Sequence, residues 1–334
     1  MTTSGTPFVF DGLNATMLSR EEVEITLKGG VSALNLTVTD VFIDLPALLI
    51  ELEQNRQRLE AVSDIAMLCT TVADLKQAHA SGRLGYVWGQ QNSLAVEDDL
   101  RHLQTLKRLG IRILQPTYNQ INKLGYGAPF KGDADKGITP LGHQWIEEMT
   151  RLKLIMDLSH CGHRTASDYL AAVKVPVVIS HANAYAVCPS LRNKTDDHIR
   201  AVAKTGGLIG GVMWSPAVRH DKRPTMDDFL NHIDHMIKVG GVDHVAWSSD
   251  ITEGKFPTRE RWEKSYGPKG YDPAITGVLG SWYTYEDRMN IDYQSLGHTP
   301  RIWDGMKKRG YSQTDIEKVM GGNWLRVMRD VWGE

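Results

Sequence analysis

Short apolar runs alternate with longer amphipathic segments along this chain. The short runs are rich in β-branched residues and apolar at nearly every position, which is typical of strands buried on both faces of a parallel sheet. The longer segments place apolar residues at helical spacing. The expected strands are 8–11, 31–38, 85–89, 111–117, 154–159, 176–180, 207–213 and 242–249, and the expected helices between or after them are 97–109, 141–152, 164–173, 196–204 and 226–239.

Eight strands that alternate with helices predict an α/β fold, and specifically a (β/α)8 barrel. No linker rich in proline, glycine and serine divides the 334 residues, so we expect one barrel domain over 1–334. Two longer insertions, at 40–83 and 251–300, interrupt the alternation of strands and helices. We expect the second to form a lid at the barrel mouth. Residues 301–334 are expected to form a C-terminal helical segment.

Charge and composition narrow the classes of partner. The chain has 38 Lys and Arg against 40 Asp and Glu, a net charge of −2, which argues against nucleic-acid binding. No window of eighteen apolar residues predicts a membrane span, and residues 1–7 lack the pattern of a signal peptide. The cysteines, Cys69, Cys161 and Cys188, form no CxxC pair, so neither a disulfide framework nor a thiolate zinc site is indicated. We therefore expect a cytoplasmic protein that acts on a small molecule.

Three residues with metal-binding chemistry stand at expected strand ends, where the active sites of such barrels gather. His160 and His181 close the fifth and sixth strands, and Asp250 closes the eighth. Two imidazoles and a carboxylate are ligands for a catalytic zinc, which acidifies a bound water and polarises a carbonyl. The alternative is that each histidine only caps its strand by hydrogen bonding. Gln91 and Tyr118 follow the third and fourth strands, Asn183 follows the sixth strand beside His181, and these residues join the candidate site.

The remaining histidines and Cys161 carry weaker signals. His232 and His235 lie three apart on an expected outer helix, where a solvated face is the favoured interpretation. His298 falls in the expected lid and is able to reach the mouth from there. Cys161 follows His160 directly, and we expect a small buried side chain because the sequence places no basic partner beside it.

Several motifs resemble the membrane (renal-type) dipeptidase family, the M19 peptidases of the amidohydrolase superfamily, and they occur in order along nearly the whole chain. They are Phe10-Asp-Gly, Gly137-Ile-Thr-Pro-Leu-Gly, Met156-Asp-Leu-Ser-His160, Ile179-Ser-His181-Ala-Asn-Ala, Pro189-Ser-Leu-Arg-Asn193, Asp243-His-Val with Ser-Asp250, and Gly322-Asn-Trp-Leu-Arg-Val. The resemblance implies an amidohydrolase-like barrel, a homodimer and a centre with two zinc ions. It also implies that Arg192 binds the substrate carboxylate.

This chain departs from the ligand set that the resemblance implies. The His-x-Asp of the first strand is replaced by Leu13 and Ala15, the bridging Glu by Gln91, and the fourth-strand His by Tyr118. Leu and Ala offer no lone pair to a metal, and Gln is a neutral and poor bridge. Asp11 is the acidic residue that precedes the His-x-Asp and does not restore it. His160, His181 and Asp250 therefore remain as ligands for one zinc ion at most, or for none.

Three functions stay open on the sequence. The first is a dipeptidase-like hydrolase of a small carboxylate-bearing amide or dipeptide that uses at most one zinc ion. In it Asp250 is the general base, Arg192, Tyr118 and Asn183 bind substrate, and Tyr118 and Gln91 face the oxyanion. The second is a metal-free lyase, decarboxylase or isomerase that uses the same residues for acid–base chemistry. The third is a catalytically silent barrel that binds a small molecule.

Overall fold

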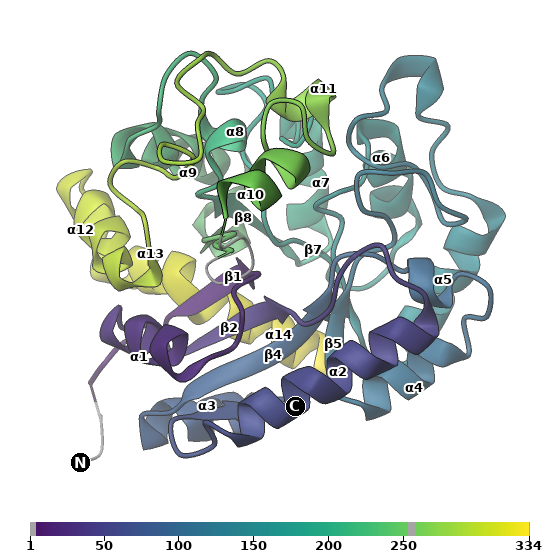
Figure 1. Cartoon of the computed structure of the whole chain (residues 1–334), viewed down its shortest axis with the longest axis horizontal. Coiled ribbons are helices and arrows are strands. Elements are labelled where there is room, and N and C mark those ends of the chain that lie inside the picture. Colours follow the sequence, from purple (N-terminus) through teal and green to yellow (C-terminus); the bar gives the residue numbers. More distant parts are fainter. Residues whose placement is uncertain (1–4, 253–257, 334) are drawn as a thin grey trace.

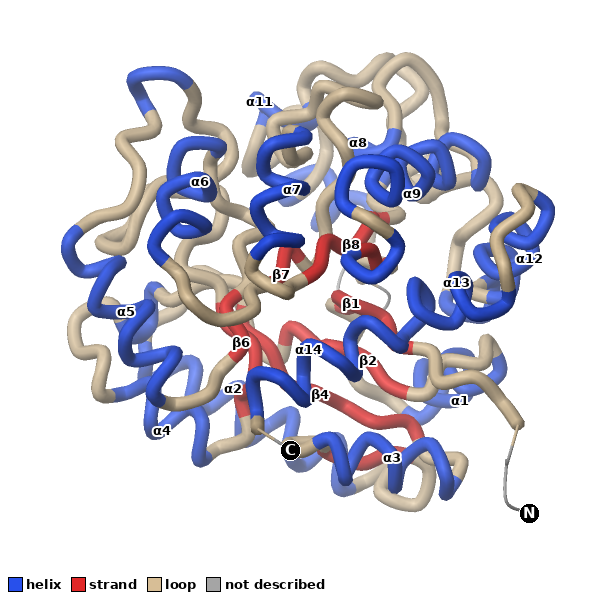
Figure 2. The backbone as a smooth tube through the Cα atoms, turned by 180° about the vertical axis from the view of Figure 1, so that it is seen from behind, coloured by secondary structure: helices blue, strands red, loops and turns tan. Residues whose placement is uncertain are grey.

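A ring of parallel strands surrounded by helices forms the centre of the computed structural model, which describes residues 5–252 and 258–333 (Figure 1, Figure 2). The strands are β1 Phe10–Asn14, β2 Ala33–Thr37, β3 Ala66–Leu68, β4 Leu84–Gln90, β5 Ile111–Leu114, β6 Ile155–Met156, β7 Val178–Ile179, β8 Leu208–Val212 and β9 Val245–Ser248. The order is β1-β2-β4-β5-β6 in one sheet and β7-β8-β9 in another.

Backbone hydrogen bonds join the two sheets into the predicted barrel. On one side, the Leu158 N–H donates to the Val178 carbonyl at 2.9 Å and links β6 to β7. On the other, the Asp250 N–H donates to the Leu13 carbonyl at 3.0 Å and links β9 to β1. The eight barrel strands match the eight expected runs, and the (β/α)8 fold is confirmed. The short strand β3 was not expected, because three residues are too few to show a pattern of apolar positions. It pairs with the N-terminal residues of β4, from Leu84 to Tyr86.

The helices cover the outside of the barrel and its lower end. They are α1 Arg20–Lys28, α2 Leu45–Glu60, α3 Val72–Ser81, α4 His102–Arg108, α5 Pro140–Arg151, α6 His163–Ala172, α7 Asp196–Lys204, α8 Ser215–Val218, α9 Met226–Gly240, α10 Arg259–Ser265, α11 Pro273–Thr276, α12 Pro300–Lys308, α13 Gln313–Glu317 and α14 Asn323–Trp332. No helix in residues 5–252 and 258–333 is long and apolar enough to cross a membrane.

Capping side chains fix where several helices begin. The hydroxyls of Thr139 and Thr225 accept hydrogen bonds from the first turns of α5 and α9. The expected helix over 97–109 begins only at His102, since its start carries no side-chain cap. There Glu97 instead accepts the backbone N–H of Lys123. The expected C-terminal helical segment 301–334 contains α12, α13 and α14.

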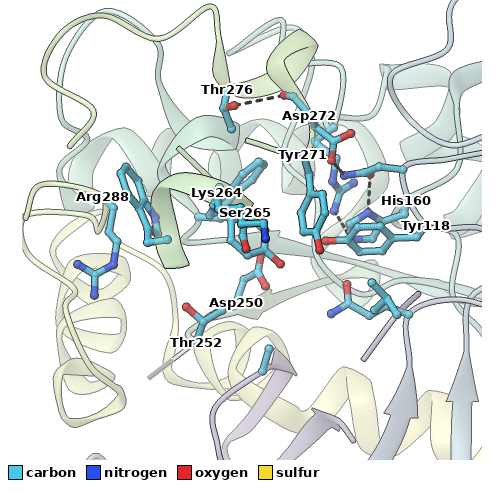
Figure 3. Close-up of a pocket in the computed structure, with 18 of the residues that line it drawn as sticks. Tyr118, His160, Asp250, Thr252, Lys264, Ser265, Tyr271, Asp272, Thr276 and Arg288 are labelled. Atoms are coloured by element: carbon cyan, nitrogen blue, oxygen red, sulfur yellow. Dashed lines mark hydrogen bonds between the residues drawn. The ribbon is translucent and has the colours of Figure 1, made fainter. Parts of the chain in front are cut away.

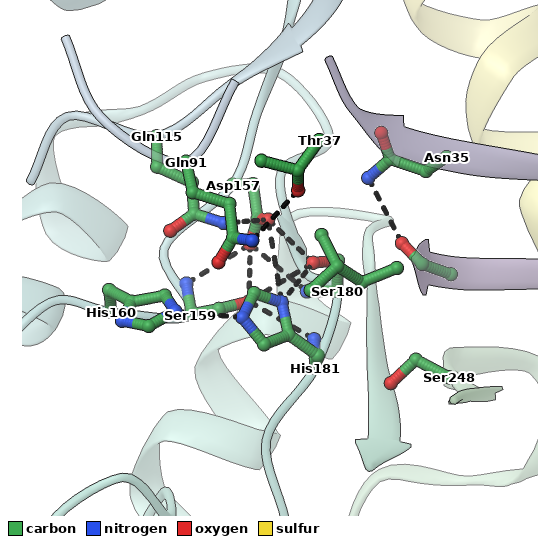
Figure 4. A network of polar contacts seen from close by, with 12 residues as sticks. Asn35, Thr37, Gln91, Gln115, Asp157, Ser159, His160, Ser180, His181 and Ser248 are labelled. Atoms are coloured by element: carbon green, nitrogen blue, oxygen red, sulfur yellow. Dashed lines mark hydrogen bonds and ion pairs between the residues drawn. The ribbon is translucent and has the colours of Figure 1, made fainter. Parts of the chain in front are cut away.

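The barrel interior changes from apolar to polar toward the mouth. Each barrel strand contributes one residue to a buried apolar layer that packs on Trp324, Val327 and Met328 of α14: Phe10, Ala33, Val87, Ile113, Ile155, Val178, Leu208 and Ala246. Two residues further along each strand, on the same face, stand Gly12, Asn35, Gly89, Gln115, Asp157, Ser180, Gly210 and Ser248. Polar groups therefore begin one layer below the mouth (Figure 4).

Two buried aspartates hold the two sheets together through hydrogen bonds at the places where the sheets meet. Asp157 accepts the N–H groups of Ser159 and Ser180, each at 3.0 Å, and so ties β6 to β7. Asp11 accepts the Ser249 N–H at 2.7 Å and the Ser249 hydroxyl at 2.5 Å, and so ties β9 to β1. Burial raises the pKa of Asp11 to about 6, although these hydrogen bonds oppose the shift.

The raised pKa of Asp11 predicts a change of stability with pH. The folded state holds the Asp11 proton more tightly than the unfolded state. The protonated carboxyl therefore adds to the free energy of unfolding below pH 4, and this stabilisation is lost as the pH rises through 6. The free energy of unfolding should fall by about 3 kcal/mol over that window relative to Asp11→Asn. Urea unfolding of both proteins at several pH values measures the difference, and parallel pH curves would contradict the assignment.

Candidate active site

A cavity of about 280 Å³ opens at the C-terminal ends of the strands. Its floor comes from residues that follow strands, and its roof from residues 258–289, which include α10 and α11 (Figure 1). Among the described residues, the aromatic side chains that line it are Phe42, Tyr118, Trp214, Trp262, Tyr266, Tyr271 and Tyr283. The charged side chains of the same part of the chain that line it are Asp40, Arg192, Asp250, Arg261, Lys264, Asp272 and Arg288. Such a cavity suits a small molecule with both a charged and a planar or apolar part.

His160, His181 and Arg192 meet at the floor of the cavity. The Nε2 atoms of His160 and His181 are 2.9 Å apart, and Nη2 of Arg192 lies 3.2 Å from Nε2 of His160. Burial, together with the positive charge of Arg192, holds the pKa of both histidines well below the ordinary value. Both imidazoles are therefore neutral near pH 7, and the fixed charge at this point is that of the guanidinium.

Arg192 is buried and makes no ion pair with any residue that the structure describes. Its side chain is 3% exposed and donates to the carbonyls of Ser159 and His181 as well as to His160. Within residues 5–252 and 258–333, no carboxylate lies within ion-pair distance of it. A buried cation is costly unless a charge compensates it, and a planar guanidinium is suited to a carboxylate. The arrangement therefore leaves room for an anionic group of a ligand.

Asp250 enters the cavity from the end of β9. Its φ is +51°, a left-handed backbone conformation that few residues other than glycine adopt and that is frequent at functional sites. The backbone on both sides of this turn is fixed, because Asp250 donates to the Leu13 carbonyl and Ala15 donates to the Ile251 carbonyl. The turn places the carboxylate among the lining residues (Figure 3).

Tyr118 and Gln91 supply neutral hydrogen-bonding groups. The Tyr118 ring stacks on His160 with 4.0 Å between ring centroids, and its phenol hydrogen bonds with that of Tyr266. Burial raises the pKa of Tyr118 well above its ordinary value, so the phenol keeps its proton. Gln91 Nε2 donates to the Thr37 hydroxyl at 2.7 Å and has a second N–H.

The structure brings most of the sequence-predicted residues together, but not all. Gln91, Tyr118, His160, Arg192 and Asp250 line the cavity. His181 is 1% exposed and lies beneath His160 and Arg192 rather than at the surface of the cavity. Asn183 is misplaced as a substrate-binding residue: its amide oxygen accepts the Val212 N–H and its amide nitrogen donates to the Val212 carbonyl, so β8 occupies both groups.

The structure settles three further predictions about single side chains. His232 is fully buried and bonds to the backbone of Ala184 and Val218, so the expected solvated face is wrong for it. His298 lies beside α1 and does not line the cavity. Cys161 is buried as expected, and burial raises its pKa to about 11.

Asn119 and Asp272 are site residues that the sequence did not reveal. The Asn119 amide nitrogen donates to Asp272 at 2.5 Å, and its amide oxygen lies 2.7 Å from Nδ1 of His160. Asn119 is the second residue after the expected fourth strand, next to Tyr118, so its position was a usable signal. Asp272 had none, because it lies 153 residues away in the insertion and only folding brings it over the mouth.

The match to a known family decides what kind of protein this is. The model of the membrane dipeptidase family, peptidase family M19, matches residues 43–264, about two thirds of the 334 residues. The chain belongs to the M19 family. The predicted resemblance is thereby confirmed, and with it a dipeptidase-like hydrolase as the kind of enzyme.

A curated relative matches most of this M19 chain in sequence, and solved structures share its fold. It is 28% identical over 273 residues, 79% of the chain and 89% of the relative, to a Klebsiella pneumoniae protein described as an uncharacterized protein in the pqqA 5' region. An amidohydrolase structure from Pseudomonas aeruginosa is 29% identical with a TM-score of 0.88, over 98% of this chain and 97% of that one. A Rhodobacter sphaeroides metallopeptidase with a phosphinate mimic of the dipeptide L-Ala-D-Ala is 21% identical with a TM-score of 0.76, over 98% of this chain and 100% of that one, and shows the shared fold.

The residues of this M19 chain do not fit the two-metal centre that the resemblance implies. Leu13 is buried and apolar, and Ala15 lines the cavity with a methyl group. No group of three His, Cys, Asp or Glu side chains in the described part of the chain has the arrangement of a metal site. The expected set of His160, His181 and Asp250 is therefore not assembled, and the Arg192 guanidinium contacts the nitrogen that a metal would need.

Proposed function

We propose that this chain hydrolyses a small amide that carries a carboxylate, such as a dipeptide, without the two-metal centre. The observation that carries the proposal is the buried Arg192 at the floor of the cavity, which has no ion-pair partner among residues 5–252 and 258–333. Family membership supports amide hydrolysis, and the dipeptide mimic bound by the Rhodobacter sphaeroides neighbour supports a dipeptide-like substrate.

The roles of the lining residues follow from their chemistry. Arg192 pairs with the substrate carboxylate, and the aromatic walls hold the rest of the molecule. Asp250 takes a proton from a water molecule whose oxygen bonds to the amide carbon, and that proton passes to the leaving nitrogen as the C–N bond breaks. Tyr118 and Gln91 donate hydrogen bonds to the oxygen on which negative charge develops. No step in this scheme uses a metal ion.

Paired substrates test the proposal directly. Dipeptides with a free C-terminal carboxylate should be hydrolysed, and the same dipeptides with a C-terminal amide should be hydrolysed at least about 100-fold more slowly, because Arg192 loses its partner. N-acyl amino acids extend the panel. Equal rates for each pair would contradict the role of Arg192, and no hydrolysis of any free-carboxylate substrate would contradict the reaction.

The proposal also predicts that the activity does not depend on a metal ion. Activity and melting temperature should be the same after extensive chelation as after addition of zinc, because the described residues lack a three-ligand site. Elemental analysis of protein purified without chelator should find much less than one equivalent of zinc. A loss of activity on chelation that zinc restores would contradict the proposal and would return His160 and His181 to the role of ligands.

A non-hydrolytic reaction on the same barrel is the second candidate. It is favoured by Leu13 and Ala15, which remove two donors at once while the rest of the cavity keeps its acid–base groups. A lyase, decarboxylase or isomerase would use Asp250 and Tyr118 without activating water. Binding of carboxylate ligands without hydrolysis, followed by product analysis by mass spectrometry, distinguishes it from the first.

Three coarser features are proposed together with the function. We propose that residues 251–300, of which 253–257 lie outside the described residues, act as a lid on a single-barrel chain. We also propose that the protein is a homodimer and that it works in the cytoplasm on a small molecule. The cavity roof at 258–289 supports the lid, and the family resemblance supports the dimer. Light scattering of the purified protein checks the number of subunits.

A further inference from the structure

A chain of hydrogen bonds runs from the roof of the cavity to its floor. Asp272 stands at the start of α11, and its carboxylate accepts a hydrogen bond from the Asn119 amide nitrogen at 2.5 Å. The Asn119 amide oxygen lies 2.7 Å from Nδ1 of His160, and Nε2 of His160 faces Arg192 at 3.2 Å. In Figure 3, Asp272 and Tyr271 reach from the roof toward Tyr118 and His160.

The direction of each hydrogen bond follows from the donors and acceptors available. An ionised carboxylate only accepts, so the Asn119 amide nitrogen must face Asp272. The amide oxygen then faces His160 and can only accept, so Nδ1 of His160 carries the proton. For a neutral imidazole, this leaves the lone pair on Nε2, which lies 3.2 Å from the Arg192 guanidinium nitrogen and 2.9 Å from Nε2 of His181 and accepts from the guanidinium. Reversal of the amide would set its oxygen against the Asp272 carboxylate, where neither group can donate.

We propose that Asp272 is a positioning residue that acts through Asn119 to hold His160 in its Nδ1–H tautomer and so keeps Arg192 in place to receive the substrate carboxylate. The functional meaning of this inference rests on the proposed function, but the tautomer itself does not. The position of the roof over the cavity thereby determines which nitrogen of His160 at the floor carries the proton. A simpler role for Asp272 would be only to fasten the roof.

Other contacts hold the roof in the same place and make the two roles separable. Tyr271 packs against Phe42 with 5.1 Å between ring centroids, and Tyr266 hydrogen bonds with Tyr118. Within the roof, the Thr276 hydroxyl donates to the Gly267 carbonyl at 3.0 Å. Loss of one roof contact therefore need not displace the whole segment, whereas loss of the Asp272 carboxylate removes the group that orients Asn119.

Nitrogen NMR of histidine-labelled protein tests the inference without any substrate. His160 should show a protonated Nδ1 and a lone-pair Nε2 in the wild type, with its signals assigned by their loss in His160→Gln or, if that variant does not fold, His160→Asn. Asp272→Asn keeps the shape but can donate as well as accept, so both tautomers should be populated. Asp272→Glu should restore the wild-type signature at least in part.

A matched control distinguishes the positioning role of Asp272 from a role in which it only holds the roof in place. Thr258→Val removes the hydroxyl that accepts the Arg261 N–H at the start of α10, a hydrogen bond inside the roof in which neither Asp272 nor Asn119 takes part, and it should leave the His160 signals unchanged. With a working substrate, Asp272→Asn should raise KM about tenfold with a smaller change in kcat. A wild type with the proton on Nε2, or an Asp272→Asn variant with unchanged His160 signals, would overturn the inference while leaving the proposed function intact.

Discussion

Replacement of Asp250 by asparagine should lower kcat about 1,000-fold and leave KM nearly unchanged. The amide has the shape of the carboxylate but cannot take a proton from water, and a positioned general base typically contributes two to four orders of magnitude. The left-handed backbone at Asp250 is tolerated by asparagine, so the fold should be retained. Steady-state kinetics on the best dipeptide of the panel, with circular dichroism to check folding, provide the measurement.

Asp40→Asn is the matched control for the charge of Asp250. Asp40 also lines the cavity, and its carboxylate accepts the Phe42 N–H at 2.9 Å in the loop after β2. Both substitutions remove one negative charge from the cavity, but only one removes the base at the end of β9. A similar loss of kcat in both variants would show that net charge matters and that Asp250 is not the base.

Substitution of Arg192 should weaken substrate binding more than any other single substitution described above. Arg192→Met removes the charge, and we expect KM to rise about 100-fold, or about 3 kcal/mol, because a charge-assisted pair with the substrate carboxylate is lost. Arg192→Lys keeps the charge but loses the planar fork, so its KM should lie between those of the other two proteins. Calorimetric titration with a non-hydrolysed carboxylate ligand reports the same loss in Kd.

The C-terminally amidated substrate controls for indirect damage at Arg192. The guanidinium also supports the carbonyls of Ser159 and His181, so its removal is able to disturb the floor. If Arg192 acts on the carboxylate, Arg192→Met should slow the free-carboxylate dipeptide much more than its amide. Equal losses on both substrates would assign Arg192 a structural role and would remove the main support for the proposed function.

The repeating pattern of strands and helices predicted the barrel because that pattern is local. Each strand is an apolar run, and the handedness and closure of alternating strands and helices leave few other folds. Burial on one outer helix was harder to predict. His232 looked solvated in the sequence but is buried, because packing of α9 against the barrel decides which side of the helix faces inward.

The candidate site was predictable where a residue closes a strand and not where it depends on a partner far away in the sequence. Gln91, Tyr118, His160 and Asp250 were found from their positions and do line the cavity. Asn183 occupies an equivalent position, but the neighbouring strand takes up its amide. Position at a strand end therefore predicts the neighbourhood of a side chain and not the direction in which it points.

The sequence by itself determined that this is an M19-type barrel and that the first strand offers no metal donors, because fold pattern and side-chain chemistry at Leu13 and Ala15 are properties of the residues alone. Only the tertiary structure decided that Arg192 contacts His160 and that Asp272 reaches Asn119. These pairs are 32 and 153 residues apart, and the hydrogen bonds form only when packing of the barrel and its roof brings them within 3.2 and 2.5 Å.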